Sequence, residues 1–208
     1  MLVTSIKNLI FDLGGVILDL SIADTLHSFS KLSKIDVKKV EHLFTTSAGF
    51  EEYEKGAFDD AAFRDFVRKT YSISESDRAI DQCWNAMLLG IPKVKLDLLL
   101  RLQNEYQVFL LSNTNGIHIQ HINEVMLPQI AGAKNLESYF HKAYYSHRMR
   151  KRKPDAEIFE QVVEENHLLP EETLFLDDNL MNIKGAQSLG IKTVHVHTPN
   201  LILDYFHA

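Results

Sequence analysis

The sequence predicts an α/β fold in which a doubly wound parallel sheet of about five strands carries an inserted α-helical domain. Two observations predict the sheet: short apolar runs alternate with amphipathic helical segments, and several of these runs end in small or acidic residues. A third observation predicts the insertion, because helical periodicity is continuous from about residue 20 to residue 90. The expected organisation is a Rossmann-like core of residues 1–19 and 91–208, interrupted by a helical domain of residues 20–90.

The first predicted strand is the apolar run that ends at Phe11 and is followed by Asp12. This run, which only Lys7 and Asn8 interrupt, is typical of a strand buried on both faces of a parallel sheet. Gly14 and Gly15 break the strand, since glycine tolerates positive φ and close approach of other groups to the backbone. Asp12 is therefore expected at the carboxyl end of a strand, where open α/β sheets bind ligands. An Asp-x-Gly turn explains the stretch equally well if it stands alone.

The inserted segment is predicted to be a small helical bundle without strands. Helical spacing of apolar residues indicates helices over residues 22–33, 36–47, 59–70 and 75–88. Asp36, either Asp59 or Asp60, and Ser74 are placed as their N-caps. The aromatic side chains of this segment are interpreted as the core of the bundle.

An alternation of helices and strands resumes after residue 90. Predicted helices cover residues 93–105, 117–126, a segment opened by Pro154, and a segment that ends near Leu189 before Gly190. Predicted strands cover residues 108–111, 142–145, 173–176 and 192–197. Connections of this kind between strands favour a parallel sheet.

Polar residues follow the predicted strands at the positions where a parallel sheet binds ligands. These residues are Asp12, Ser112 with Asn113, Lys153, and Asp177 with Asp178. In a parallel sheet they converge on one edge. Clustered carboxylates need a cation, and hard oxygen ligands suit Mg²⁺. A lysine and a hydroxyl with backbone amides suit phosphate oxygens, which leaves one carboxylate as a nucleophile. The chemistry predicts phosphoryl transfer through an aspartyl-phosphate.

These motifs, in this order, resemble those of the haloacid dehalogenase-like (HAD) hydrolase superfamily. They are Phe11-Asp12-Leu13-Gly14-Gly15-Val16, Leu111-Ser112-Asn113, Lys153-Pro154 and Leu176-Asp177-Asp178-Asn179. The sequence is most similar to the phosphatase branch that carries a helical cap after the first strand. Each motif is weak alone, but four in order at compatible spacing, covering essentially the whole chain, form a specific signal.

The resemblance implies a role for each matching residue. Asp12 would be the nucleophile, Ser112 and Asn113 would bind the phosphoryl group, and Lys153 would neutralise charge between Asp12 and phosphate. The implied Mg²⁺ ligands are Asp12, the Gly14 carbonyl and Asp178, with Asp177 in support. The expected activity is Mg²⁺-dependent hydrolysis of a small phosphorylated metabolite, with a sugar phosphate as one candidate.

Substrate specificity is expected to lie in the helical cap. Residues near Phe50, Glu51, Tyr53 and Glu54 follow Gly49 and could face the site, although the sequence does not orient them. Polar groups there would suit the hydroxyl groups of a sugar.

One position departs from the family's pattern. Phosphatases of the superfamily usually carry a second aspartate two residues after the nucleophile as general acid and base, and here that residue is Gly14. Loss of such a group typically costs about 10²–10⁴ in rate. Asp19 and His118 are candidate substitutes, although a structural role is favoured for both. Because Gly14 stands at this position, an alternative function is a catalytically weakened scaffold that binds phosphorylated ligands or a protein partner. A dehalogenase is less favoured, because halide displacement needs no Mg²⁺.

Composition narrows the range of partners. The chain has 22 lysines and arginines against 28 aspartates and glutamates, a net charge of −6, which argues against nucleic acid or an anionic membrane as partner. The basic run of residues 148–153 is interpreted as a solvated rim that attracts phosphorylated substrates. A single cysteine excludes an intramolecular disulfide and favours the cytoplasm. No segment fits a signal peptide or a membrane span. A monomer or a weak homo-oligomer is expected.

Overall fold

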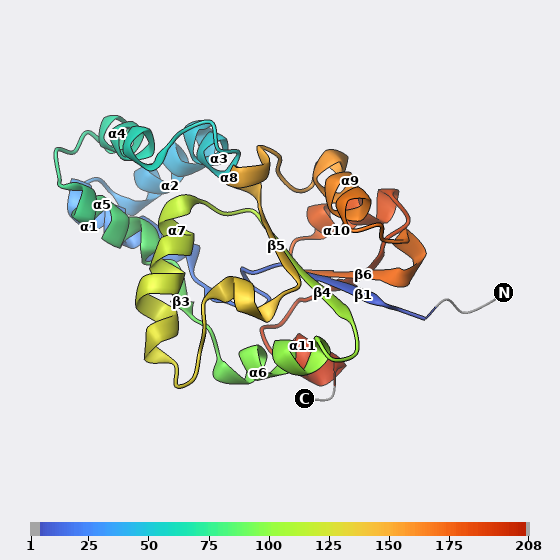
Figure 1. The fold of residues 1–208 in the computed structure, drawn as a ribbon. Coiled ribbons are helices and arrows are strands. Elements are labelled where there is room, and N and C mark those ends of the chain that lie inside the picture. Colours follow the sequence, from blue (N-terminus) through green and yellow to red (C-terminus); the bar gives the residue numbers. More distant parts are fainter. Residues whose placement is uncertain (1–4, 207–208) are drawn as a thin grey trace.

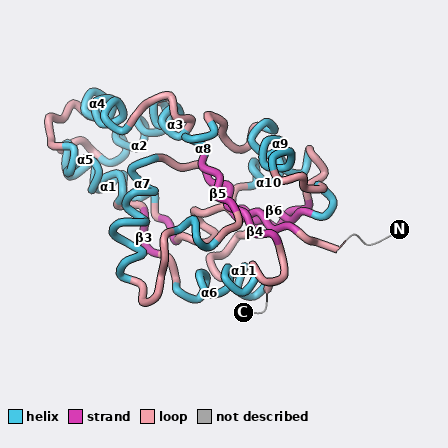
Figure 2. The backbone as a smooth tube through the Cα atoms, viewed as in Figure 1, coloured by secondary structure: helices cyan, strands magenta, loops and turns pink. Residues whose placement is uncertain are grey.

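The computed structural model describes residues 5–206 and contains a five-stranded parallel sheet. Its strands are β1 (Asn8–Phe11), β4 (Gln107–Ser112), β5 (Lys142–Tyr145), β6 (Thr173–Asp177) and β7 (Lys192–His195), in the order β5-β4-β1-β6-β7. Figure 2 shows β4, β5 and β6 among the strands at the centre of the core. The chain builds outward from β1 first on one side and then on the other, so the strand order reverses at β1. Ligands of open α/β sheets bind at such a point.

Helices cover both faces of the sheet, as Figure 1 shows. On one face, α6 (Lys93–Leu102) and α11 (Leu201–Tyr205) pack against Leu9 and Phe11 of β1. On the other, α9 (Ala156–Glu165) and α10 (Leu180–Ser188) pack against Ile10. Successive strand residues thus enter opposite layers, and both layers are apolar because both faces are covered. The predicted α/β architecture is confirmed.

The insertion after β1 contains five helices that surround a core of their own, at one end of the molecule (Figure 1). They are α1 (Ile22–Ser33), α2 (Val37–Thr46), α3 (Gly49–Glu54), α4 (Asp60–Tyr71) and α5 (Asp77–Asn85). Asp36 and Asp59 cap α2 and α4, as predicted. The N-cap predicted at Ser74 is wrong: Ser76 caps α5 by accepting a hydrogen bond from the Ala79 N–H. The short helix α3 was not predicted.

The expectation of no strand between residues 20 and 90 is also wrong. Asp19 and Leu20 form β2, which pairs in antiparallel fashion with β3 (Leu88–Gly90) where the insertion leaves and rejoins the core. Two to three residues are too few to show strand alternation, and the partners are distant in sequence. The domain limits at residues 19/20 and 90/91 fall within this ribbon and stay a prediction.

Smaller differences occur elsewhere in the core. The helix expected over residues 117–126 is α7 (Gly116–His121) followed by a π-helical turn over Ile122–Met126. The last strand ends at His195 rather than at residue 197. A short helix, α8 (Ser146–Met149), follows β5. In the described part of the chain, no helix has the length and apolar character needed to cross a membrane.

Candidate active site

The centre of the site is the buried ammonium group of Lys153, in the loop before α9. Its Nζ donates hydrogen bonds to Asp12 at 2.8 Å, to Asp177 at 2.7 Å and to the carbonyl oxygen of Leu111 at 2.8 Å. These three acceptors stand at the carboxyl ends of β1, β6 and β4. Groups at the ends of three adjacent strands therefore bind one cation, because the carboxyl ends of parallel strands lie along the same edge of the sheet.

Asp12 is 8% exposed and follows β1 directly. Its backbone N–H extends the sheet by donating to the Leu176 carbonyl oxygen at 2.9 Å. Its Oδ1 accepts from the backbone N–H of Leu13 at 2.7 Å and from Lys153. Among the described residues, its Oδ2 has no hydrogen-bond partner. One carboxylate oxygen is thus fixed while the other is available.

The two neighbouring aspartates at the end of β6 have different surroundings. Asp177 is fully buried, and its oxygens accept from Lys153, from the Asn179 N–H at 2.7 Å and from the Asn182 side chain at 3.1 Å. Asp178 is exposed. Asp12, Asp177 and Asp178 each offer an oxygen within 4.8 Å of the others. Asp177 is held in place, whereas Asp178 is open to a ligand.

The charges of this cluster are not balanced. Burial raises the pKa of Asp12 to about 7, although Lys153 opposes the shift, and burial with the charge of Asp177 raises the pKa of Asp178. Burial acts to lower the pKa of Lys153, but Asp12 and Asp177 outweigh it and the pKa lies above its usual value. Three carboxylates face one ammonium, which leaves an excess of negative charge, and their oxygens are hard donors. Such a cluster fits a divalent cation such as Mg²⁺.

Two glycines bring the backbone close to this cluster. Gly15 has φ of 71°, and a Cβ there would lie 2.3 Å from Asp178 Oδ2. A Cβ at Gly14 would lie 2.4 Å from the Leu20 side chain of β2. The loop after Asp12 therefore packs against Asp178 on one side and the hinge ribbon on the other.

The residues after β4 form the next wall of the site. Ser112, at the end of β4, is buried. The Asn113 side chain makes two 3.0 Å hydrogen bonds with the backbone of Lys153, one to its carbonyl oxygen and one from its N–H. Thr114 is fixed by Ser146, which accepts from the Thr114 N–H at 2.9 Å and donates to its carbonyl oxygen at 3.1 Å. The Asn113 amide thus positions Lys153.

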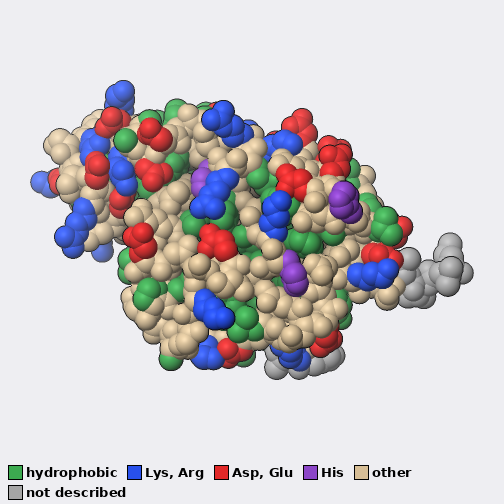
Figure 3. All heavy atoms as spheres, in the orientation of Figure 1, with side chains coloured by type: hydrophobic (Ala, Val, Ile, Leu, Met, Phe, Trp, Pro, Cys, Tyr) green, Lys and Arg blue, Asp and Glu red, His purple; other side chains and the backbone are tan. Residues whose placement is uncertain are grey.

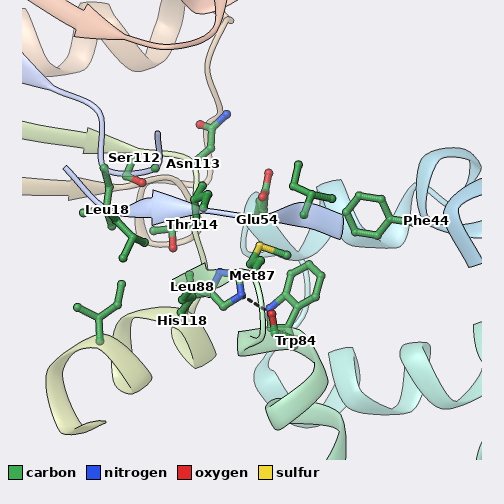
Figure 4. A pocket seen from close by; sticks show the side chains of 15 residues that line it. Leu18, Phe44, Glu54, Trp84, Met87, Leu88, Ser112, Asn113, Thr114 and His118 are labelled. Carbon is green, nitrogen blue, oxygen red and sulfur yellow. Dashed lines mark hydrogen bonds between the residues drawn. The ribbon is translucent and has the colours of Figure 1, made fainter. Parts of the chain in front are cut away.

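A cavity of about 160 Å³ opens between this wall and the helical insertion, as seen in Figure 4. The core contributes Gly14, Ser112, Asn113, Thr114 and His118, and the insertion contributes Phe44, Glu54, Trp84 and Met87. A second cavity of about 390 Å³ shares Phe44, Glu54 and Trp84 with the first. Its other lining is largely polar and includes Thr45, Thr46, Ser47, Glu51 and Arg152. The first cavity, at the strand ends, therefore adjoins a second, polar cavity that is lined mostly by the insertion.

A buried polar network joins the insertion to the core beside the first cavity. Trp84 Nε1 donates to Asn115 Oδ1 at 3.3 Å, and the Trp84 carbonyl oxygen lies 3.2 Å from His118 Nε2. Asn115 Nδ2 lies 3.1 Å from His118 Nδ1, so both ring nitrogens have partners. Burial lowers the pKa of His118 to about 4. Neutral His118 then donates from Nε2 and accepts at Nδ1.

Neither suggested substitute for an acid at position 14 is available in this structure. His118 is committed to the network just described. Asp19 accepts a 2.9 Å hydrogen bond from the fully buried Lys95 and does not line either cavity. Both residues have the structural role favoured from the sequence.

The basic run is less solvated than expected. Arg152 donates from Nε to Glu54 at 2.9 Å, Arg148 lies 4.8 Å from the centre of the Tyr145 ring, and Lys153 is buried in the site. Figure 3 shows acidic and basic side chains interspersed over one face of the molecule.

Two residues of the site gain a definite place only from the structure. The sequence places Glu54 near the site without an orientation, and in the structure this residue lines both cavities. Sequence reasoning missed Asn182. The sequence carries no local signal for it, because Asp177 ends a strand and Asn182 lies on the helix that follows.

Comparisons with known proteins agree with this geometry. A model of the haloacid dehalogenase-like hydrolase family matches residues 6–190. A D-ribitol-5-phosphate phosphatase from Bacteroides thetaiotaomicron is 32% identical over 193 residues, which cover 90% of each protein. The structure of a HAD-family enzyme from the same organism, in complex with magnesium and inorganic phosphate, is similar with 42% identity and a TM-score of 0.83, over 91% of this chain and 93% of that one.

A more distant similarity concerns the fold alone. An L-2-haloacid dehalogenase from Xanthobacter autotrophicus is 18% identical, with a TM-score of 0.57 over 90% of this chain and 76% of that one. The family model spans most of the chain, including every strand-end residue of the site. The chain belongs to the haloacid dehalogenase-like hydrolase family.

Proposed function

We propose that this protein is a Mg²⁺-dependent phosphatase that hydrolyses a small polyol phosphate or sugar phosphate through an aspartyl-phosphate on Asp12. The observation that carries the proposal is the buried cluster in which Lys153 bonds both Asp12 and Asp177 while one oxygen of Asp12 has no partner among the described residues. The similarity to a D-ribitol-5-phosphate phosphatase supports the substrate class.

Asp12 is suited to in-line attack on phosphorus. Its Oδ1 is held by Lys153 and by the Leu13 N–H, and its Oδ2 has no hydrogen-bond partner among the described residues. Ser112 and the backbone of Asn113 are proposed to bind the transferring phosphoryl group, since the Asn113 side chain is already bonded to the Lys153 backbone. Lys153 holds its charge beside the attacking oxygen. Phosphoryl transfer depends mainly on such positioning and charge stabilisation.

Asp12, Asp178 and the Gly14 carbonyl are proposed to hold the Mg²⁺ ion. Asp177 is bonded to Lys153, Asn179 and Asn182, so its role is to support the other groups. When bound, the ion would neutralise charge on the phosphoryl oxygens.

The helical insertion, residues 20–90, is proposed to act as a cap that selects the substrate. The phosphoryl group would lie at the strand ends, and the remainder of the molecule would pass Trp84 into the polar cavity. Thr45, Thr46, Ser47 and Arg152 line that cavity and offer hydrogen-bond donors and acceptors suited to hydroxyl groups.

The test is a panel of polyol, sugar, nucleotide and acyl phosphates assayed with and without Mg²⁺, with Asp12→Asn as control. Phosphate release from a polyol or sugar phosphate should require Mg²⁺ and be lost in Asp12→Asn. No metal-dependent release above the Asp12→Asn control on any substrate would refute the proposal. That outcome would favour the binding scaffold.

A further inference from the structure

Hydrolysis of a polyol phosphate leaves one chemical requirement unmet by the residues described so far. The bond that breaks joins phosphorus to an alcohol oxygen, and an alkoxide is a poor leaving group unless it receives a proton in the transition state. Gly14 has no side chain to supply one. The need for another donor rests on the proposed function, under which a different group of this chain must provide that proton.

Most ionisable groups near the site are committed to other partners. Lys153 donates to three acceptors, and Asp177 accepts from three groups. His118 has a partner on each ring nitrogen, and Asp19 is bonded to Lys95. Glu54 is the ionisable side chain that lines both cavities and keeps an oxygen without a hydrogen-bond partner among residues 5–206.

Glu54 is the last residue of α3 and lines both the cavity at the strand ends, where Figure 4 shows its side chain, and the polar cavity. Its Oε2 accepts from Arg152 Nε at 2.9 Å, and its Oε1 has no hydrogen-bond partner among the described residues. Arg152 immediately precedes Lys153, so this hydrogen bond ties Glu54 to the loop that carries the central ammonium. The side chain is 25% exposed.

The end of α3 is docked against the core. Tyr53 donates to Asp60 at 2.6 Å and accepts from the Ile117 N–H at 3.4 Å, across the boundary between insertion and core. A Cβ at Gly56 would lie 2.1 Å from the carbonyl oxygen of His147, so the turn after α3 lies directly on the core backbone. These contacts hold Glu54 over the site without a substrate to order it.

We propose that Glu54 is the general acid that protonates the leaving alcohol oxygen and the general base for the second step. In the first step, an Asp12 oxygen forms a bond to phosphorus, the bond from phosphorus to the alcohol oxygen breaks, and that oxygen takes the proton of the Glu54 carboxyl. In the second step, water attacks phosphorus, Glu54 takes one of its protons, and the Asp12 carboxylate leaves. Glu54 ends protonated and Asp12 free, so the cycle closes.

The electrostatic surroundings support both protonation states of Glu54. Burial raises the pKa of its carboxyl, Arg152 acts in the opposite direction, the charge of Glu51 raises it and that of Lys153 lowers it. The net shift is upward, so the Glu54 carboxyl keeps its proton to a higher pH than a solvated glutamate does. After transfer, the Arg152 guanidinium stabilises the carboxylate that remains.

The test compares Glu54→Gln with a matched control, Glu52→Gln. Glutamine keeps an oxygen for Arg152 but cannot exchange a proton. Glu52 is two residues earlier on α3, is exposed and lines neither cavity, so its variant removes a similar charge away from the site. Each protein is assayed with D-ribitol 5-phosphate and with p-nitrophenyl phosphate, whose leaving group departs without a proton.

In Glu54→Gln, kcat for D-ribitol 5-phosphate should fall by about 10²–10⁴, the range for loss of a general acid or base. With p-nitrophenyl phosphate the first step should survive while hydrolysis of the aspartyl-phosphate slows, so rapid mixing should show a burst of p-nitrophenolate equal to the enzyme concentration. Glu52→Gln should show no burst. Glu54→Asp should recover part of the lost rate, because it restores a carboxyl on a shorter side chain.

Three results would overturn the assignment. The first is a parent-like rate in Glu54→Gln. The second is a raised KM with unchanged kcat, which would make Glu54 a binding residue. The third is an equal loss of kcat on both substrates without a burst. Thermal unfolding of each variant separates these results from misfolding. A parent enzyme that releases phosphate with Mg²⁺ from neither of these substrates and from no other member of the panel would refute the proposed function itself, and the role of Glu54 with it.

Discussion

Replacement of Lys153 by methionine tests the charge balance on which the site depends. Methionine has a similar length and an apolar stem, so packing against Phe175, whose ring centre lies 5.3 Å from the ammonium, should be largely kept. The change removes the ammonium and its three hydrogen bonds, at 2.7, 2.8 and 2.8 Å. Asp12 and Asp177 would then face each other without the cation between them.

Removal of one partner from a buried ion pair costs about 3–5 kcal/mol. A domain has about 5–15 kcal/mol of stability, so the variant should fold with a much reduced margin. In a chain of this size, 1 kcal/mol shifts Tm by about 2–4 °C, so a fall of roughly 6–20 °C is expected. The loss should be greater at pH 8 than at pH 6. Without Lys153 the pKa of Asp12 rises further, and its protonation in the folded state then restores stability as pH falls.

Urea unfolding in metal-free buffer at pH 6 and pH 8 measures this effect. Lys184→Met is the matched control, because Lys184 is exposed on α10 and its replacement should change the free energy of unfolding by no more than about 0.5 kcal/mol. A Lys153→Met protein within about 1 kcal/mol of the parent at pH 8 would contradict the reasoning.

Three further changes test other parts of the site. Gly15→Ala introduces a Cβ at a residue with φ of 71°, 2.3 Å from Asp178 Oδ2, so it should lower the free energy of unfolding by about 1–2 kcal/mol and weaken Mg²⁺ binding about 10- to 100-fold. Calorimetry measures the Mg²⁺ affinity, and an unchanged affinity would remove Asp178 from the ligand set. Added to Glu54→Gln, the pair Gly14→Asp and Leu20→Ala should raise the rate about tenfold or more, because Leu20→Ala removes the side chain that lies 2.4 Å from the new Cβ. Gly14→Asp added without Leu20→Ala should raise the rate less. The pKa of His118 is lowered to about 4, so as pH falls from about 6.5 the unfolded chain binds a proton on this histidine before the folded protein does, and up to about 3 kcal/mol of stability is lost by about pH 4. In urea titrations, His118→Gln should flatten this part of the curve of stability against pH. An unchanged curve would contradict the buried neutral state.

The sheet was predictable because its strands are continuous apolar runs with polar ends. All four residues of β1 are buried, and so are all five of β6. A strand covered on both faces leaves this signature in the sequence without knowledge of its neighbours. The parallel order then brings Asp12, Lys153 and Asp177 together, and the structure shows their hydrogen bonds.

Other features depend on contacts that no local pattern records. The ribbon of β2 and β3 joins residues about 70 positions apart and has no periodicity to detect. The N-cap of α5 is Ser76 rather than Ser74, and both serines are equally suited to the role by residue type, so the sequence does not decide between them. The pairing of Glu54 with Arg152 spans 98 positions, so the sequence could not orient Glu54 towards the strand ends.

The position of Trp84 makes the joint between the two parts of the molecule observable. It is the only tryptophan in the chain, it is almost fully buried, and its indole stacks on the His118 ring with centres 4.9 Å apart. It also borders both cavities. Intrinsic fluorescence excited at the tryptophan band therefore reports on this one junction, without any label. Stopped-flow emission can time the arrival of a ligand and any separation of the insertion from the core in the unmodified protein.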